Sequence, residues 1–303
     1  MSDLELRDLK YFETIADLGH LGKAAQKLHR SQPALTTCVR RLEETFGTRL
    51  FIRVGRGIQL TRAGEALLNQ ARRMRVAADD AIREMNEIAH GNAGQVRIGA
   101  APTMAQLVLP AAFRVFLSGA KNVQLRTLIA QNDLLKASLR AGDLDFFISF
   151  DSKLDDDLDA KTILEDVVVV AASNSHEVFK KRPNLKDLAA YEWVLAGPSV
   201  ETRQWLDLAF SSRGLHRPIA RIETNLVTLS PSLIEQTGLL SFISRRHLSG
   251  HGGLPLKEVV LKETTMRRWG KVIYRKDSHL PPAAQRFLKL LCSSGRALFQ
   301  ENS

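Results

Sequence analysis

Hydrophobic and polar residues in the segment 20–42 follow the period of two short helices joined by a tight turn. In the first half, apolar residues recur at i, i+3, i+4 and i+7, which predicts a helix that shows one face to a core. Ser31 then offers an N-cap, and Pro33 falls where the first turn of a helix tolerates a missing N–H group, so a second helix is expected to begin near Gln32. The apolar positions of the first helix are Leu21, Ala24, Ala25 and Leu28.

The second helix keeps Leu35, Val39 and Leu42 on one apolar stripe, which leaves its polar side chains for solvent or a partner. Short polar side chains at a helix N-terminus can reach base edges in the major groove of DNA, and arginines behind them can reach phosphates. A helix-turn-helix needs this arrangement, although the solvated face of an ordinary helix pair would explain any one of these residues. The candidate DNA-binding residues of this helix are Gln32, Pro33, Thr36, Thr37, Arg40 and Arg41.

Basic residues are concentrated around the two helices. Nine lysines and arginines lie between residues 20 and 62, against two glutamates, and such an excess favours a polyanion. Residues 6–18 have one apolar helical face and should complete a three-helix core, with Gly19 ending the helix. Segments 49–53 and 58–61 flank a glycine-containing turn and predict a hairpin. Such a wing would carry Arg53 and Arg56 toward the DNA backbone or the adjacent minor groove.

The run from Ala24 to Arg53 reads A-A-x-x-L-x-x-S-Q-P-A-L-T-x-x-V-x-x-L-E-x-x-F-G-x-x-L-F-x-R, and L-T-x-A-G follows at residues 60–64. This run resembles the N-terminal signature of LysR-type transcriptional regulators, and the resemblance implies a winged helix-turn-helix that binds double-stranded DNA. Two positions depart from the family pattern. Gly22 stands where Ser or Thr more often caps the helix, which bears on local stability, and Cys38 stands where a polar residue is common, which bears on base preference.

From Thr61 the pattern changes to one long helix, which Thr61 should cap and which should stop near residues 90–91. Apolar residues at strict 4-3 spacing along it predict the seam of a coiled coil. Pairing through this seam would give a dimer whose two reading heads meet successive half-sites of a pseudo-palindrome; a long helix that lies on its own protein is the alternative. The seam residues are Leu67, Ala71, Met74, Ala78, Ala81, Met85 and Ile88.

Residues 91–94 are typical of a linker, and beyond them strands and helices alternate, which is typical of parallel α/β layers. One set occupies residues 96–150, a second occupies 167–243, and segment 270–274 predicts a strand that returns to the first set. This out-and-back path indicates two lobes joined by crossing strands. The expected strands are 96–99, 123–129, 144–150, 167–171, 193–195, 220–223, 240–243 and 270–274, and the expected helices are 104–117, 133–140, 202–210, 226–236 and 283–291.

The two-lobed unit is similar to the effector domains of LysR-type regulators and to periplasmic binding proteins. The string A-G-D-L-D-F-F-I at 141–148 resembles a family motif, and Glu223-Thr224-Asn225 resembles its second crossover segment. The predicted fold is therefore an α/β multidomain chain. It comprises an N-terminal winged helix-turn-helix (1–62), a linker and dimerisation helix (63–91), and a two-lobed, periplasmic-binding-protein-like effector domain (92–303). Lobe I covers about 92–163 and 265–303, and lobe II about 164–264.

Polar residues follow several of the predicted strands or open the helices after them. In open α/β lobes, ligands gather at the carboxyl ends of strands and at helix N-termini, where free N–H groups attract anions. Thr103 is the strongest candidate, although it could equally be a simple N-cap. The candidate effector-binding residues are Thr103, Gln131, Ser149, Ser199, Thr202 and Asn225.

The formal net charge of +10 is not confined to the DNA-binding part: residues 1–62 carry +4, residues 63–91 carry −1, and residues 92–303 carry +7. The C-terminal excess fits solubility or, alternatively, an acidic small molecule or a protein surface. The cysteines, Cys38 and Cys292, lie in separate elements, and the histidines show no metal-type pairing, so no disulfide, metal or cofactor is expected. The charged N-terminus and the lack of a long apolar segment predict a cytoplasmic protein.

Together these patterns predict a sequence-specific DNA-binding transcriptional regulator, an activator or a repressor, whose homodimers or homotetramers respond to a small-molecule effector. The resemblance implies that the effector changes the closure of the lobes and thereby the contact with RNA polymerase. The sequence has no nucleophile elbow, P-loop or dinucleotide fingerprint, so no enzyme is expected. Two alternatives stay open: an enzyme or transport protein built on the C-terminal lobes, and a DNA-packaging protein without a ligand.

Overall fold

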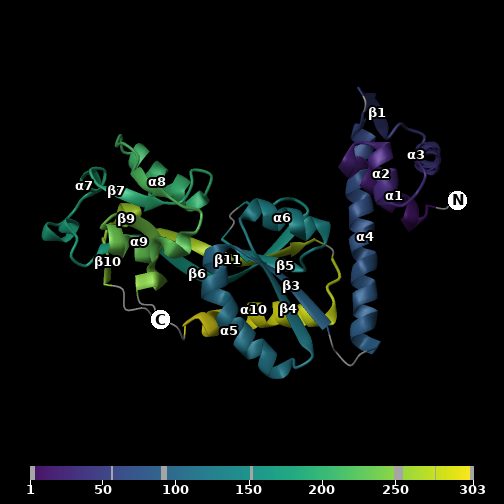
Figure 1. Cartoon of the computed structure of the whole chain (residues 1–303). Coiled ribbons are helices and arrows are strands. Elements are labelled where there is room, and N and C mark those ends of the chain that lie inside the picture. The colour runs from purple at the N-terminus through teal and green to yellow at the C-terminus, as the bar shows by residue number, and fades with distance from the viewer. Residues whose placement is uncertain are drawn as a thin grey trace. The chain divides into compact units, whose positions relative to one another are not determined.

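The computed structural model describes residues 4–55, 57–89, 94–150, 153–248, 255–276 and 278–300. The chain divides into two compact units (Figure 1). The first is formed mainly by the residues up to Gly91, and the second by Asn92–Leu139, Asp143–Asp277 and Pro282–Ser303. Within the described ranges, no helix combines the length and the apolar character needed to cross a lipid bilayer.

Three helices and a hairpin form the N-terminal part of the first unit, here called the reading head. Ser31 is the N-cap of the third helix, where its Oγ accepts a hydrogen bond from the N–H of Ala34 at 3.3 Å. The two strands pair antiparallel, as predicted. The bounds are α1 (Leu6–Leu18), α2 (Leu21–Lys27), α3 (Gln32–Phe46), β1 (Phe51–Val54) and β2 (Gly57–Leu60).

The core of the reading head contains residues of the predicted apolar stripes and also Cys38, which was expected on the polar face of α3. Phe12, Leu42 and Leu50 are buried in one cluster, and Cys38 is buried with them. Val39, predicted for the stripe, is half-buried. The side chain of Cys38 therefore faces the core, and the expectation that it bears on base preference is wrong.

The long helix α4 (Arg62–Ala89) follows the hairpin, and Thr61 caps it by accepting a hydrogen bond from the N–H of Gly64 at 3.0 Å. The first two seam positions contribute to the core of the unit itself, since Leu67 packs against the Phe12 cluster and Ala71 is buried. Arg72 and Arg75 both pair with Glu13 of α1. The first half of the seam therefore packs within this unit and is not available to a second copy.

The second unit is built around one mixed sheet in the order β4-β3-β5-β11-β6-β9-β7-β8, with β10 paired to β6. Its strands are β3 (Gly94–Ala100), β4 (Val123–Ile129), β5 (Phe146–Ser149), β6 (Leu158–Ser173), β7 (Glu192–Leu195), β8 (Ile219–Glu223), β9 (Leu240–Ser244), β10 (Leu256–Glu258) and β11 (Met266–Arg275). Its helices are α5 (Pro102–Gly119), α6 (Asn132–Ala141), α7 (Leu185–Leu188), α8 (Glu201–Ser211), α9 (Ser230–Thr237) and α10 (Pro282–Gln300), with short 3-10 turns η1 (Glu177–Lys180), η2 (Val227–Leu229), η3 (Arg245–Leu248) and η4 (Lys262–Thr264).

Strands β6 and β11 join two sets of parallel strands (Figure 1). They pair antiparallel along most of their length, and β11 continues onto β5 while β6 continues onto β9. Parallel pairing, as predicted, holds within each set, where β3 pairs with β4 and β5, and β7 pairs with β8 and β9. The joining strands are antiparallel because the chain passes out through one and returns through the other.

Three local predictions need correction. Glu223-Thr224-Asn225, expected as the second crossover segment, lies at the end of β8 on the edge of the sheet, so the crossing strands are β6 and β11 alone among the described strands. Helix 226–236 is divided into η2 and α9, because Pro231 sits in the first turn of α9 and has no N–H with which to continue a preceding helix. Strand β6 spans 16 residues, far beyond the predicted 167–171.

Candidate functional site

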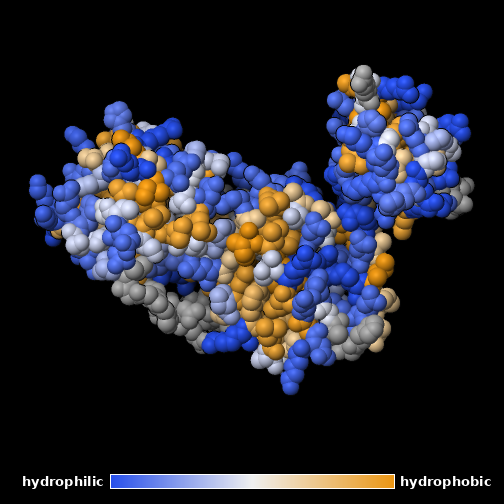
Figure 2. Space-filling model, in the orientation of Figure 1, coloured by the Kyte–Doolittle hydropathy of each residue, from blue (hydrophilic) through white to orange (hydrophobic). Residues whose placement is uncertain are grey.

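The first turns of α3 present the predicted polar residues to solvent. Gln32, Pro33, Thr36, Thr37 and Arg40 are all exposed, and Figure 2 shows a largely hydrophilic surface over this part of the chain. The hydroxyl of Thr36 donates to the carbonyl of Gln32 at 3.0 Å, which orients this exposed side chain along the helix. This surface has the short polar side chains that major-groove contact requires.

Arg41, predicted to contact DNA, makes an ion pair inside the reading head. Its guanidinium donates a hydrogen bond to the carboxylate of Asp8 on α1, which is buried. That hydrogen bond and the charge of Asp8 raise the pKa of Arg41. Burial, with a further contribution from Asp8, raises the pKa of the neighbouring Cys38 thiol to about 12. Arg41 thus holds α3 against α1, which favours a structural role over the expected phosphate contact.

The start of α2 is capped by a residue that the sequence analysis did not single out. The Nδ1 atom of His20 accepts hydrogen bonds from the backbone N–H groups of Gly22 at 3.1 Å and Lys23 at 3.3 Å. The capping function expected from position 22 is therefore supplied by His20. The available signal was the position of a side chain with an acceptor atom immediately before the first apolar helical residue.

The hairpin presents one of its two predicted arginines within the described residues. Arg53 lies on β1 opposite Ile58 and is exposed. Arg56 lies outside the described residues. Further along the chain, the second half of the α4 seam is open to solvent: Met74, Met85 and Ile88 are 45%, 58% and 60% exposed. Ala81 is exposed and Ala78 half-buried, and Ile82, which the sequence analysis did not name, is also exposed.

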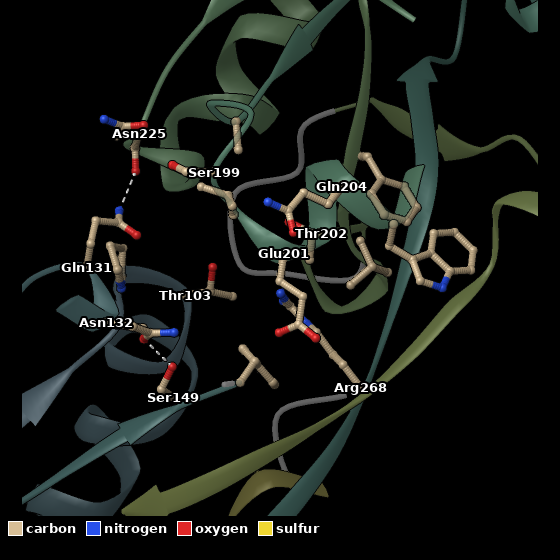
Figure 3. Close-up of a pocket in the computed structure, with 18 of the residues that line it drawn as sticks. Thr103, Gln131, Asn132, Ser149, Ser199, Glu201, Thr202, Gln204, Asn225 and Arg268 are labelled. Atoms are coloured by element: carbon tan, nitrogen blue, oxygen red, sulfur yellow. Dashed lines mark hydrogen bonds between the residues drawn. The ribbon is translucent and has the colours of Figure 1, made fainter. Parts of the chain in front are cut away.

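A cavity of about 720 Å³ lies in the second unit, between the two sets of strands. All six residues predicted for effector binding line it, and Figure 3 shows Thr103, Gln131 and Ser149 facing Ser199, Thr202 and Asn225 across it. Each of these residues follows a strand or opens a helix at the same end of its set, which is why their positions in the sequence predict one site.

The polar groups of the cavity include the hydroxyl of Thr103 and a hydrogen bond between Gln131 and Asn225. Thr103 is buried, in the first turn of α5, and its hydroxyl has no hydrogen bond to another described residue. The N-cap of α5, Ala101, makes no side-chain cap, so the first N–H groups of this helix have no capping side chain. From the opposite lobes, Gln131 Nε2 donates to the carbonyl of Asn225 at 3.4 Å (Figure 3).

A charged cluster that the sequence did not predict forms another wall of the cavity. Arg268 of β11 donates to the fully buried carboxylate of Asp166 on β6 at 2.7–2.8 Å, and Ser244 donates to the same carboxylate at 2.5 Å. The guanidinium of Arg268 also stacks 3.7 Å from the ring centre of Phe150. These residues come from three strands and a loop, so only the register of the sheet brings them together.

His247 lies beside this cluster. Its Nε2 atom is 3.3 Å from Oε1 of Gln106 on α5, and its Nδ1 atom is buried without a hydrogen-bond partner among the described residues. Burial lowers the pKa of His247, Arg268 lowers it further, and Asp166 opposes both. The described residues contain no group of three or more His, Cys, Asp or Glu side chains placed to hold a metal ion.

Comparison with known proteins shows similarity along nearly the whole chain. Residues 6–65 match the bacterial regulatory helix-turn-helix protein, lysR family, and residues 89–294 match the LysR substrate binding domain. The chain is 30% identical to the uncharacterised HTH-type transcriptional regulator YdcI of Escherichia coli K12, over 79% of each chain. It is 26% identical to the HTH-type transcriptional regulator CbbR of Rhodospirillum rubrum, over 96% of this chain and 97% of CbbR. The structure of full-length CbnR with its target DNA is similar at a TM-score of 0.55 and 25% identity, over 96% of this chain and all of CbnR.

Proposed function

The chain belongs to the LysR family of bacterial helix-turn-helix transcriptional regulators, and we propose that it acts as a homodimer or homotetramer through the residues described above. In this proposal α3 reads DNA, the exposed part of α4 pairs with a second copy, and the cavity binds a small effector. The chain performs no catalysis, needs no cofactor, and works on DNA in the cytoplasm.

The main support for DNA binding is the exposed polar face of α3. Gln32, Thr36 and Thr37 are on its first turns, where a helix laid in the major groove approaches base edges. Arg40 on the same helix and Arg53 on β1 of the same reading head are exposed for phosphate contact. The solved complex of CbnR with its target DNA supports this use of a similar chain.

The dimer is supported by the apolar residues left on α4. Met74, Ile82, Met85 and Ile88 are each at least 45% exposed, and a second copy would remove them from water. Two reading heads held by one pair of helices would meet half-sites about 10 base pairs apart. A DNA-packaging protein without a ligand would share the heads but would lack a use for the cavity.

The effector part is supported by the open first turn of α5. Uncapped N–H groups and the hydroxyl of Thr103 favour a negatively charged or strongly accepting group there. An effector that touches both lobes would stabilise one degree of closure, and we propose that this change reaches RNA polymerase through the DNA-bound heads. The sign of regulation, activation or repression, depends on where the operator lies.

In vitro selection from a pool of random duplex DNA tests this function. We expect the full-length protein to enrich a pseudo-palindrome, and sedimentation to show a dimer or larger species. A Met85→Asp variant should sediment as a smaller species, whereas an Asn69→Asp control, at an exposed position of the same helix off the seam, should keep the parent size. Failure to enrich any motif would contradict sequence-specific reading and leave packaging as the better account.

A further inference from the structure

The polar lining of the cavity is dominated by neutral groups that can both donate and accept hydrogen bonds. They come from both lobes and include Thr103, Gln131, Asn132, Ser199, Thr202 and Asn225 (Figure 3). Hydroxyl and amide side chains of this kind match ligand hydroxyl groups, which also donate and accept. A ligand with several hydroxyls could therefore be bonded from both sides of the cavity at once.

Much of this capacity is unused in the protein itself. The side chains of Thr103, Ser199 and Thr202 make no hydrogen bond to any described residue. Asn132 uses Oδ1 to accept from Ser149 at 2.6 Å, which leaves its amide N–H groups for a ligand. Polar groups enclosed by a ligand without hydroxyls would lose water and gain nothing in exchange, at a cost to affinity.

The charges of the lining do not favour a ligand with two or more acid groups. Arg268 is paired with Asp166, and Lys136 Nζ lies 3.2 Å from the carboxylate of Asp155. Within the lining itself, the carboxylates of Asp133 and Glu201 accompany the cations Lys136, Lys153 and Arg268, and Figure 3 shows Glu201 directed toward Arg268. A second negative group would meet these carboxylates, whereas hydroxyl groups could donate to them.

The aromatic residues leave few ring faces for a flat aromatic ligand. The face of Phe150 is covered by the guanidinium of Arg268. Trp205 and Phe242 stack on each other, with ring centres 5.7 Å apart and planes 3° apart, so each has one face occupied. A single free ring face can contact the C–H groups of a sugar ring, whereas a flat aromatic acid would be held best between two ring faces.

We propose that the effector is a polyhydroxylated molecule, a sugar, alditol or sugar acid, with at most one carboxylate. This inference rests on the proposed function of the cavity and adds the chemical class of its ligand. A single carboxylate would bind at the first turn of α5, beside Thr103, and the hydroxyls would span Asn132 on one lobe and Thr202 on the other.

Thermal unfolding and calorimetric titration of the full-length protein test the class with three matched panels. The first contains hexoses, hexitols and hexonates such as gluconate. The second contains hexanoate and benzoate, which carry the same charge without the hydroxyls, and the third contains the dianions adipate and phthalate. Each panel is repeated on the cavity variants Thr202→Val and Thr103→Val, and on Thr127→Val, a control on β4 outside the cavity.

We expect one or more members of the first panel to raise the unfolding temperature, with affinity about tenfold lower in Thr202→Val and unchanged in Thr127→Val. Stabilisation by no member of the first panel would overturn the class. Stabilisation by benzoate or phthalate that is lost in Thr103→Val would also overturn it, while the cavity would stand as the effector site. Failure of the DNA-binding function is seen separately, as loss of motif selection.

Discussion

His20 and Gly22 form a matched pair at the start of α2. The imidazole of His20 folds back so that its Nδ1 accepts from the N–H of Gly22, and a Cβ at position 22 would lie 3.1 Å from Cε1 of that ring. The same Cβ would lie 3.7 Å from the side-chain oxygen of Gln32, the first residue of α3. A glycine at position 22 therefore gives room for a histidine cap beside the first residue of the DNA-reading helix.

Replacing this cap should weaken the reading head. We expect His20→Ala to lower the free energy of unfolding by about 1 kcal/mol, because two backbone N–H groups lose their acceptor. His20→Asn, which supplies another acceptor, should recover most of the loss. Urea unfolding of both variants measures the difference, and equal stability of His20→Ala and the parent would show that the cap contributes nothing.

Arg41 and Arg40 should separate stability from DNA binding, although they are neighbours in sequence. Arg41→Ala leaves the buried carboxylate of Asp8 without its cation, so it should lower the unfolding temperature. Arg40→Ala removes an exposed side chain with a weak 3.6 Å partner, Glu44, and should weaken DNA binding at nearly unchanged stability. If both variants unfold like the parent, Arg41 is free for the phosphate contact that the sequence suggested.

Removing one partner of the ion pair between β6 and β11 should greatly lower the free energy of unfolding. In Asp166→Ala the buried guanidinium of Arg268 loses its partner, and we expect a loss of about 3–5 kcal/mol in unfolding free energy. Removing both charges in Asp166→Ala/Arg268→Met should cost less than the single change. Denaturant unfolding of the two variants decides this, and a double variant worse than Asp166→Ala would argue that the pair is not the cause.

The lowered pKa of His247 predicts a pH effect on stability. Because the unfolded histidine has its ordinary pKa of about 6.5, the unfolded chain binds a proton at a pH where the folded chain does not. The contribution of His247 to the free energy of unfolding is therefore complete above the unfolded pKa of about 6.5. It decreases as the pH falls from there toward the lower pKa of the folded state.

His247→Gln should flatten this part of the pH profile between about pH 7 and pH 5. The pKa of His176 is also lowered by burial, so His176→Gln serves as a matched variant with its own, separate contribution. A profile that His247→Gln leaves unchanged would assign the pH effect to other groups.

Local signals in the sequence predicted the parts that depend on neighbours along the chain. The bounds of α1 and β4, the cap at Thr61 and the placement of Thr103 and Asn225 on one cavity follow from periodicity, capping signals and the positions of strand ends. The role of Arg41 could not be predicted in this way, because its partner Asp8 is 33 residues away.

The charged cluster of the cavity also depends on residues that are far apart in the sequence. Arg268 and Asp166 are 102 residues apart, and only the register of β6 against β11 places them opposite each other. His247 follows β9 in a 3-10 turn without a periodic signal. Contacts fixed by sheet register thus need the structure, whereas caps and strand ends can be predicted from the sequence.

Binding of the full-length protein to a selected operator, compared with a scrambled duplex of equal length across a range of salt concentrations, tests the central claim most directly. We expect preference for the operator, a slope of log affinity against log salt of about −5 or steeper, and a Thr36→Ala variant that loses about 1–3 kcal/mol of discrimination. A monomeric protein that binds both duplexes equally, with a slope that one or two phosphates would explain, would contradict the account.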